Sequence, residues 1–164
     1  MQEQNDILKL LPSGIRFTEP EDVEKIYRDL RPEDRAECIA SHGDPLECLQ
    51  RGYENSKYCF TGSVNDKPYM IFGVGEVEEH EGAGVVWMLG TTAINAEARF
   101  HFLKRSRLCV ENLLHKDFPL LFNCVDARNT VHIKWLKWLG FKFINLHLNY
   151  GVAKLPFYEF VRIK

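Results

Sequence analysis

The sequence lacks several features that would place it in a specialised class of protein. No apolar run approaches the ~20 residues of a membrane-spanning helix. The apolar pairs near the start, Ile7–Leu8 and Leu10–Leu11, are too short for the core of a signal peptide. The formal net charge is only −2, so bulk electrostatics give no support for nucleic-acid binding. We therefore expect a cytoplasmic protein with no membrane span.

The cysteines lack any pattern typical of a disulfide framework or a zinc site. They are odd in number, scattered and never arranged as a CxxC pair: Cys38, Cys48, Cys59, Cys109 and Cys124. A small secreted framework usually has an even count, and zinc sites need clustered ligands. We expect reduced, buried thiols and no bound metal.

Length and composition indicate one folded domain. The chain has 164 residues, 45% of them hydrophobic, and no repeat, linker or polar low-complexity segment divides it. A chain of about 150 residues buries enough surface for one core. We predict a loosely held N-terminal arm over residues 1–14 and a single domain over residues 15–164.

The first half of the chain predicts one strand, three helices and three more strands. After a short strand at 15–17, Thr18 and Glu21 have the spacing of a capping box, which predicts a helix start. Further helices are predicted to begin at Pro32 and at Asp44-Pro45, where Asp44 caps the helix. The strands expected next cover 58–61, 69–74 and 85–89.

The second half predicts a long helix over 96–116, a buried strand at 120–125 and a helix over 130–139 that ends at Gly140. Two final strands are expected at 141–144 and 158–161, the second at an edge of the sheet. The apolar face of the long helix is predicted to comprise Phe100, Leu103, Val110 and Leu114. The fold class is therefore α/β (mixed α+β), with a mostly antiparallel sheet and helices on both faces.

The order of elements resembles the GNAT (N-acetyltransferase-like) superfamily. In that superfamily the helix after the fifth strand begins near an Asn and ends in Gly-Phe, and residues 129–141, from Asn129 to Gly140-Phe141, follow this frame. The segments that carry a closer resemblance are 87–91, 123–133, 135–141 and 156–160. They look like a bacteriophage family that includes the internal virion protein A of short-tailed phages and is often described as acetyltransferase-like.

That closer resemblance implies a phage-encoded protein that acts during virion assembly. Its partners would be phage virion proteins, and it would be found in the host cytoplasm and in the virion. Neither the oligomeric state nor the role of the arm follows from the sequence.

The segment 90–99 departs from the superfamily's donor site. The resemblance implies an Arg/Gln-x-x-Gly-x-Gly/Ala turn whose amides hold the coenzyme A pyrophosphate. Here Gly90 is the only glycine, and Glu97 adds a carboxylate where a phosphate would lie. The superfamily's proton-donating tyrosine corresponds to Leu136, which cannot transfer a proton. On this reading no cofactor is bound; acetyl-CoA is the cofactor only if the protein is an active enzyme.

Polar residues gather at two predicted strand ends, where ligands of open α/β sheets bind. The candidates for cofactor binding are Gly90, Thr91, Thr92, Asn123, Asp126 and Asn129, with Arg128 beside them as a structural or anion-contact residue. They fit a small-ligand or acyl-CoA cleft. They also fit ordinary turns, in which Asn and Asp bond nearby backbone and Asn129 caps the following helix.

Two ionisable residues fall on predicted apolar faces. His132 lies between Leu136 and Leu139 on the helical wheel and is the candidate catalytic residue, as a general base; the alternative is a buried histidine with satisfied bonds. Arg107 lies within the apolar face of the long helix, where a buried guanidinium needs a partner. It either pairs with Asp126 or binds an anionic ligand.

Two functions follow from these observations. The first is a virion-associated assembly protein, built on a GNAT fold whose acetyl-CoA loop is degenerate. The alternative is an active N-acetyltransferase that moves an acetyl group from acetyl-CoA to an amine of a host or phage protein.

Overall fold

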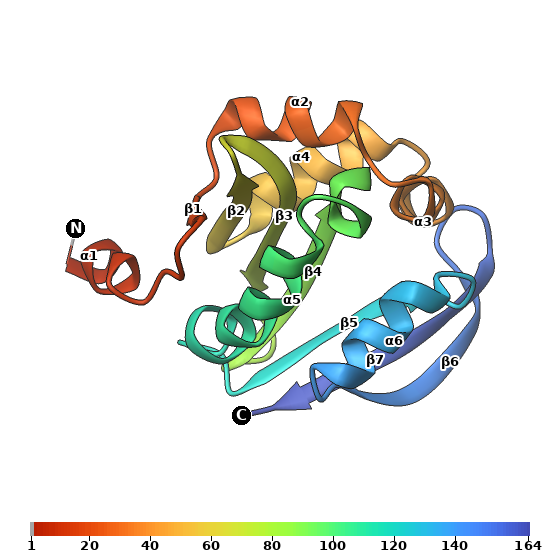
Figure 1. The fold of residues 1–164 in the computed structure, drawn as a ribbon. Helices are drawn as coiled ribbons and strands as arrows, with labels where there is room; N and C mark the ends of the chain where they lie inside the picture. The colour runs from red at the N-terminus through yellow and green to blue at the C-terminus, as the bar shows by residue number, and fades with distance from the viewer. Residues whose placement is uncertain (1) are drawn as a thin grey trace.

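The computed structural model describes residues 2–164 as a seven-stranded sheet in the order β1-β2-β3-β4-β5-β7-β6 (Figure 1). The strands are β1 (Ile15–Phe17), β2 (Tyr58–Val64), β3 (Lys67–Glu76), β4 (Ala83–Gly90), β5 (Leu120–Asp126), β6 (Lys142–Tyr150) and β7 (Leu155–Ile163). Every neighbouring pair is antiparallel except β4–β5. The expected mixed α/β class with a mostly antiparallel sheet is confirmed.

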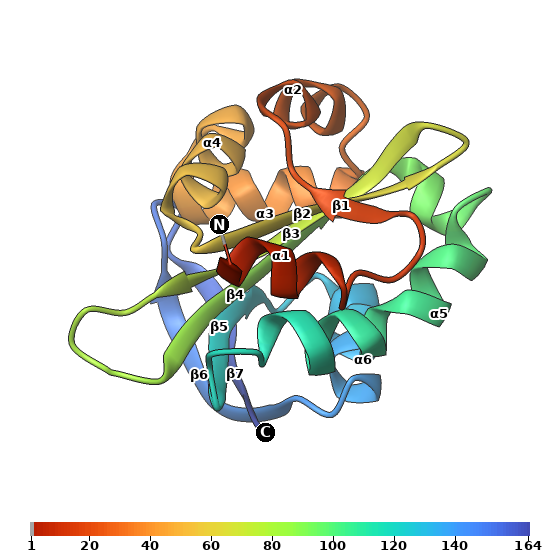
Figure 2. The ribbon, with the colours of Figure 1, turned by 90° about the vertical axis from the view of Figure 1, so that its left-hand side faces the viewer.

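Helices cover both faces of the sheet (Figure 2). On one side lie α2 (Pro20–Arg28), α3 (Pro32–His42) and α4 (Pro45–Asn55). On the other lie α1 (Gln2–Leu8), α5 (Arg99–Leu108) with the π-helical segment η2 (Cys109–Leu114), and α6 (Thr130–Trp138). Within residues 2–164, no helix combines the length and hydrophobicity needed to span a membrane.

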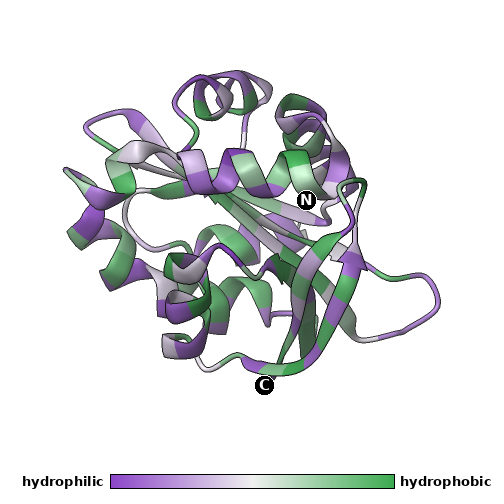
Figure 3. Cartoon of the chain, turned by 90° about the vertical axis from the view of Figure 1, so that its right-hand side faces the viewer, coloured by the Kyte–Doolittle hydropathy of each residue, from purple (hydrophilic) through white to green (hydrophobic). Residues whose placement is uncertain are grey.

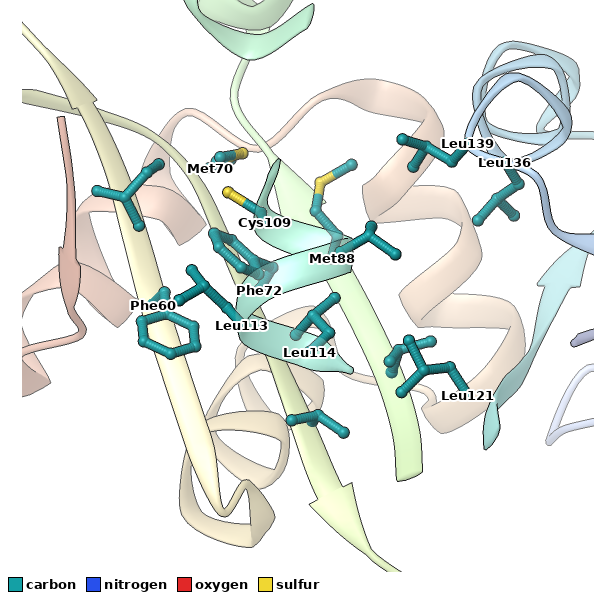
Figure 4. Packing of buried hydrophobic residues seen from close by; sticks show 14 of the residues in the cluster. Phe60, Met70, Phe72, Met88, Cys109, Leu113, Leu114, Leu121, Leu136 and Leu139 are labelled. Carbon is teal, nitrogen blue, oxygen red and sulfur yellow. The ribbon is translucent and has the colours of Figure 1, made fainter. Parts of the chain in front are cut away.

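Strand alternation divides the core into two clusters, because successive side chains of a strand point to opposite faces. On β3, Phe72 packs with η2 and α6, whereas its neighbour Ile71 packs with α2 and α4. Figure 4 shows the first cluster, in which Leu113 and Leu114 of η2 lie against the sheet. The helices mix hydrophobic and hydrophilic residues along their length (Figure 3), as expected of helices with one buried face.

The one parallel pair of strands is short. β4 and β5 are paired only from Ala83–Leu120 to Val85–Phe122. Beyond this point they separate, and Figure 1 shows them far apart where α3 crosses the end of the sheet. The opening between β4 and β5 is the feature on which the site is built.

The structure corrects three predictions about helix starts, strand order and the arm. The cap of α2 is Glu19, whose N–H donates to Asp22, while the Thr18 hydroxyl bonds Thr61 instead. β7 pairs with β5 on one side and with β6 on the other, so the edge strand is β6 rather than the last strand of the chain. Part of the predicted loose arm forms α1, held by the fully buried Ile7.

The predicted face of the long helix is also wrong. Phe100 is 72% exposed and Leu103 is 41% exposed, and the buried positions of α5 are Phe102 and Ser106. The π-helical segment explains the difference, because one extra residue per turn rotates the positions before it relative to those after it. Val110 and Leu114, which follow the start of this segment, are buried as predicted.

Arg107 is therefore exposed and does not pair with Asp126. Its guanidinium lies 4.6 Å from the ring centroid of Trp138, and one NH2 group donates to the Trp138 carbonyl at 3.1 Å. This places Arg107 in a cation–π contact at the surface rather than at an anion site.

Candidate functional site

Helix α3 holds the separated ends of β4 and β5 with two carboxylates one helical turn apart. Asp34 accepts a hydrogen bond from Gly90 N–H at the end of β4, at 2.8 Å. Glu37 Oε2 accepts bonds from Asp126 N–H at the end of β5, at 3.2 Å, and from Asn129 Nδ2, at 3.1 Å. The wide end of the opening is therefore fixed by side chains rather than by strand pairing.

A buried ion pair supports this arrangement. Arg31 and Asp34 are 4% and 1% exposed and form two hydrogen bonds, at 2.7 and 3.0 Å. Arg31 N–H also donates to the Gly90 carbonyl at 2.9 Å. The N–H and the C=O of Gly90 both point toward the opening. They are thus bonded to Asp34 of α3 and to Arg31, which precedes Pro32 at the start of α3.

Asn123 closes the narrow end of the opening. Its Nδ2 donates to the Val86 carbonyl of β4 at 2.7 Å, and its Oδ1 accepts from Cys124 N–H at 2.7 Å. The amide side chain thereby spans the gap immediately beyond the last backbone pair of β4 and β5. Asn123 therefore holds β4 and β5 together at this end of the opening. It lies within β5 rather than at the strand end where the sequence placed it.

Between these two ends, Met88 is the position of β4 whose backbone groups face the opening. The Val86 carbonyl and both backbone groups of Gly90 point away from β3. Backbone groups of a strand point to the same side at every second residue. The N–H and C=O of Met88 therefore face the opening, where β5 is not paired with β4.

Two cavities adjoin at this opening. The first, about 510 Å³, extends from the α3–α4 side to the α5–α6 side of the sheet, with Glu37, Trp87 and Leu136 in its wall. The second, about 460 Å³, lies between η1 (Thr92–Asn95), α5 and α6, with Arg99 in its wall. The residues common to both walls are Met88, His132 and Trp135. Volumes of this size fit a small molecule.

Glu37 is the ionisable group best suited to proton transfer in the first cavity. Burial raises the pKa of this carboxyl group, the charge of Asp34 raises it further, and the bonds from Asn129 and Asp126 oppose the shift, giving a pKa of about 8. Glu37 accepts both of these hydrogen bonds with Oε2. A carboxylate with a pKa near neutrality is a suitable general base.

His132 is buried at the junction of the two cavities. Its Nδ1 has no hydrogen-bond partner among residues 2–164, and its ring lies 5.4 Å from that of Trp135. Burial lowers the pKa of His132 to about 4, with a further contribution from Arg31 opposed by Asp34. The predicted place on the apolar arc is correct, but this pKa makes His132 a weaker base than Glu37.

Replacing His132 by leucine is expected to reduce the acid sensitivity of the fold. The pKa of His132 in the folded state is below its ordinary 6.5. The neutral imidazole therefore makes its full contribution to stability above pH 6.5, and this contribution is lost as the pH falls toward 4. The shift corresponds to about 2–3 kcal/mol between pH 7.5 and pH 4.5. Urea unfolding at both pH values measures this loss, which should be smaller in His132→Leu by that amount. Equal losses in the two proteins would contradict the assignment.

Most backbone amides of the turn between β4 and α5 already donate hydrogen bonds to other groups of the chain. Thr92 N–H donates to Asp29 O, Ile94 N–H to Thr91 O, and the amides of Ala96, Ala98 and Arg99 to carbonyls within residues 93–96. Ala93 N–H donates to the Thr91 hydroxyl. The amides of Thr92–Ile94, Ala96, Ala98 and Arg99 are therefore not available to a diphosphate.

The remaining predicted site residues have structural contacts. A Cβ at Gly90 would lie 2.1 Å from Ile94 Cδ1, so this glycine makes room for packing. Thr91 is buried and caps η1, and Thr92 is exposed. Asp126 is buried and binds Arg128, with its shortest contact at 2.6 Å. Asn129 caps α6, because its side chain accepts a hydrogen bond from His132 N–H. This is the helix-capping role that the sequence offered as the alternative to cofactor binding.

Sequence reasoning missed the residues of α3. Asp34 and Glu37 fall three residues apart on a predicted helix, which is also the pattern of an ordinary solvated face. Tyr150, in the wall of the first cavity, lies beyond the predicted end of its strand. Within residues 2–164, no group of three or more His, Cys, Asp or Glu side chains is placed to hold a metal ion.

No family model matches the sequence, and no curated protein matches it either. Solved structures do match over almost the whole chain. The ribosomal-protein-S18-alanine N-acetyltransferase from Escherichia coli is 15% identical, with a TM-score of 0.63 over 91% of this chain and 92% of that one. The GNAT fold, expected from the order of elements, is therefore confirmed.

Two further similar structures contain coenzyme A. An aminoglycoside acetyltransferase in complex with coenzyme A is 15% identical, with a TM-score of 0.63 over 92% of this chain and 94% of that one. The spermidine N-acetyltransferase from Vibrio cholerae, in complex with CoA and spermine, is 12% identical, with a TM-score of 0.63 over 91% and 94%. At these identities the similarity establishes the fold alone.

Proposed function

We propose that this protein is an N-acyltransferase that uses acetyl-CoA and transfers the acetyl group to an amine. The observation that carries the proposal is the opening between β4 and β5, which passes through the sheet and has Glu37 in its wall. The similarity to acetyltransferases of the same fold supports the reaction class. It favours the enzymatic alternative over a protein without a cofactor.

The residues present fit the pantetheine arm of the coenzyme better than its phosphates. Met88 N–H and C=O offer a donor and an acceptor in strand geometry, which suits an extended chain with amide groups. The β4–α5 turn does not suit a diphosphate, since its amides are bonded within the chain. The second cavity has two cations in its wall: Arg31, which pairs with Asp34, and Arg99, the exposed first residue of α5, which has no acidic partner among residues 2–164. We assign the phosphate contact to Arg99.

Two side chains of the first cavity assist the reaction, one as a base and one as a hydrogen-bond donor. Acetyl-CoA supplies a thioester, whose acyl carbon an amine can attack. Glu37 accepts the proton that the amine loses, since its pKa of about 8 suits a base near neutral pH. Tyr150 can donate a hydrogen bond to the departing thiolate, because burial and the neighbouring Cys124 raise the pKa of this phenol to about 12 and keep it protonated.

Reversing the charge of Arg99 is expected to weaken acetyl-CoA binding by about 10-fold or more, because a charge-assisted contact to phosphate becomes a repulsion. Calorimetric titration of Arg99→Glu with acetyl-CoA measures the change. Lys104→Glu is the matched control: it makes the same charge change on the same helix, but Lys104 is absent from both cavity walls and lies against Phe100. It should change the affinity less than about 2-fold.

Uncharged acetyl-pantetheine tests the binding of the pantetheine arm without the contribution of the phosphates. Its affinity should be the same for the wild type, Arg99→Glu and Lys104→Glu. If acetyl-CoA binds none of the three proteins and no amine is acetylated, the acyltransferase proposal is wrong.

The phage-specific predictions remain proposals. The similar structures give no support for a role in virion assembly, for virion partners or for a phage source. Co-purification of the protein with virion components would test that role independently of acetyl transfer.

A further inference from the structure

Two cysteines from neighbouring helices pack in one hydrophobic cluster, and one of them contacts a histidine at the α3–α4 side of the first cavity. Cys38 and His42 belong to α3, Cys48 belongs to α4, and all three line the cavity. The Cys48 sulfur lies 3.5 Å from His42 Nδ1, which is also 2.7 Å from Ser41 Oγ. Cys38 is buried and Cys48 is half-buried, so of the two thiols Cys48 is the more accessible to a small reagent.

The surroundings shift the pKa values of the two thiols in opposite directions. The side-chain hydrogen bond with Cys38 lowers the pKa of Cys48, and His42 and Arg51 lower it further against the effect of burial. The same bond and burial raise the pKa of Cys38. The other titratable groups around the pair are Asp34, Glu37, Glu47 and Tyr150. Cys48 therefore has the character of a reactive cysteine, and Cys38 lies beside it as a protonated thiol.

We propose that Cys48 and Cys38 are an oxidisable dithiol that reacts with hydroperoxides. The Cys48 thiolate attacks the hydroperoxide, the O–O bond breaks, and the products are a sulfenic acid on Cys48 and an alkoxide or hydroxide ion. Cys38 then attacks the Cys48 sulfur, and its proton leaves with the hydroxyl group as water. The product is a disulfide that joins α3 to α4. A thiolate that is accessible and has a second thiol beside it is the arrangement that favours this chemistry.

The experiment treats the reduced full-length protein with hydrogen peroxide and follows it by intact mass and peptide mapping. The expected product has lost two hydrogens and contains one Cys38–Cys48 cross-link. In Cys38→Ser the sulfenic acid on Cys48 should persist and be captured by dimedone, and in Cys48→Ser neither product should form. Cys59→Ser is the matched control, since Cys59 is buried on β2 and is not among the residues that line this cavity, and it should form the cross-link at the wild-type rate.

A second measurement does not depend on the variants of the pair. Iodoacetamide should alkylate Cys48 several-fold faster than Cys124 at pH 7, although both are half-buried, because burial raises the pKa of Cys124. His42→Gln should move the midpoint of the Cys48 alkylation profile to higher pH. The proposal is wrong if Cys48 reacts no faster than Cys124, or if oxidised wild-type protein contains no Cys38–Cys48 cross-link. Neither outcome bears on acetyl transfer.

Discussion

Replacing Glu37 by glutamine is expected to lower the acetyl-transfer rate by about 100-fold or more. A positioned general base contributes roughly 10²–10⁴-fold, and a neutral amide cannot accept the proton of the attacking amine. The rate of the wild type should rise with pH and level off near the pKa of Glu37, about 8. The inflection near pH 8 should be absent in the variant. Initial rates from pH 6 to pH 10, with saturating substrates, measure both effects.

Stability separates a catalytic role of Glu37 from a structural one. The glutamine oxygen can still accept the bonds from Asp126 N–H and Asn129 Nδ2. Because folding raises the pKa of Glu37 above its ordinary 4.5, the carboxyl group favours the folded state at low pH, and this advantage is lost as the pH rises toward 8. At pH 7 the variant should therefore unfold at the same or a higher temperature than the wild type. Glu33→Gln, on the exposed side of α3, is the control and should leave the rate unchanged. A rate loss of less than about 3-fold in Glu37→Gln would exclude Glu37 as the base.

Replacing Asp34 by alanine is expected to lower the free energy of unfolding by about 3–5 kcal/mol. The change leaves the Arg31 guanidinium buried without its carboxylate and removes the acceptor of Gly90 N–H. Breaking a buried ion pair by removing one partner typically costs this amount. Urea unfolding at pH 7 measures the loss.

The double variant Arg31→Met with Asp34→Leu shows whether the unpaired charge causes the loss. Replacing a buried ion pair by apolar residues of similar volume is often neutral, so the double variant should be more stable than Asp34→Ala alone. Glu33→Ala, at the exposed neighbouring position, should change stability by less than about 0.5 kcal/mol. A loss below about 1 kcal/mol in Asp34→Ala would show that the Arg31–Asp34 pair does not hold the end of β4.

The sequence by itself determined the class of the fold and most of its elements. Alternating and continuous apolar runs predicted the strands, since a buried strand needs hydrophobic side chains whatever its partners are. Asp44-Pro45, Asn129 and Gly140 marked helix ends correctly, because capping depends on residues close in the chain. The single glycine of segment 90–99, Gly90, also predicted that the amides of this segment would not wrap a diphosphate, and the bonds within the turn agree.

The site itself was decided by the tertiary structure. Glu37 is suited to act as a base because burial in the folded protein raises its pKa, against the opposing hydrogen bonds from Asp126 and Asn129, which are distant in sequence. Arg107 and Phe100 were misplaced because a π-helical segment rotates α5, which no local pattern announces. Cys38 and Cys48 join one cluster because α3 and α4 pack side by side. Residue types and their spacing fix local structure, whereas the pKa and reactivity of a side chain depend on neighbours that only folding brings to it.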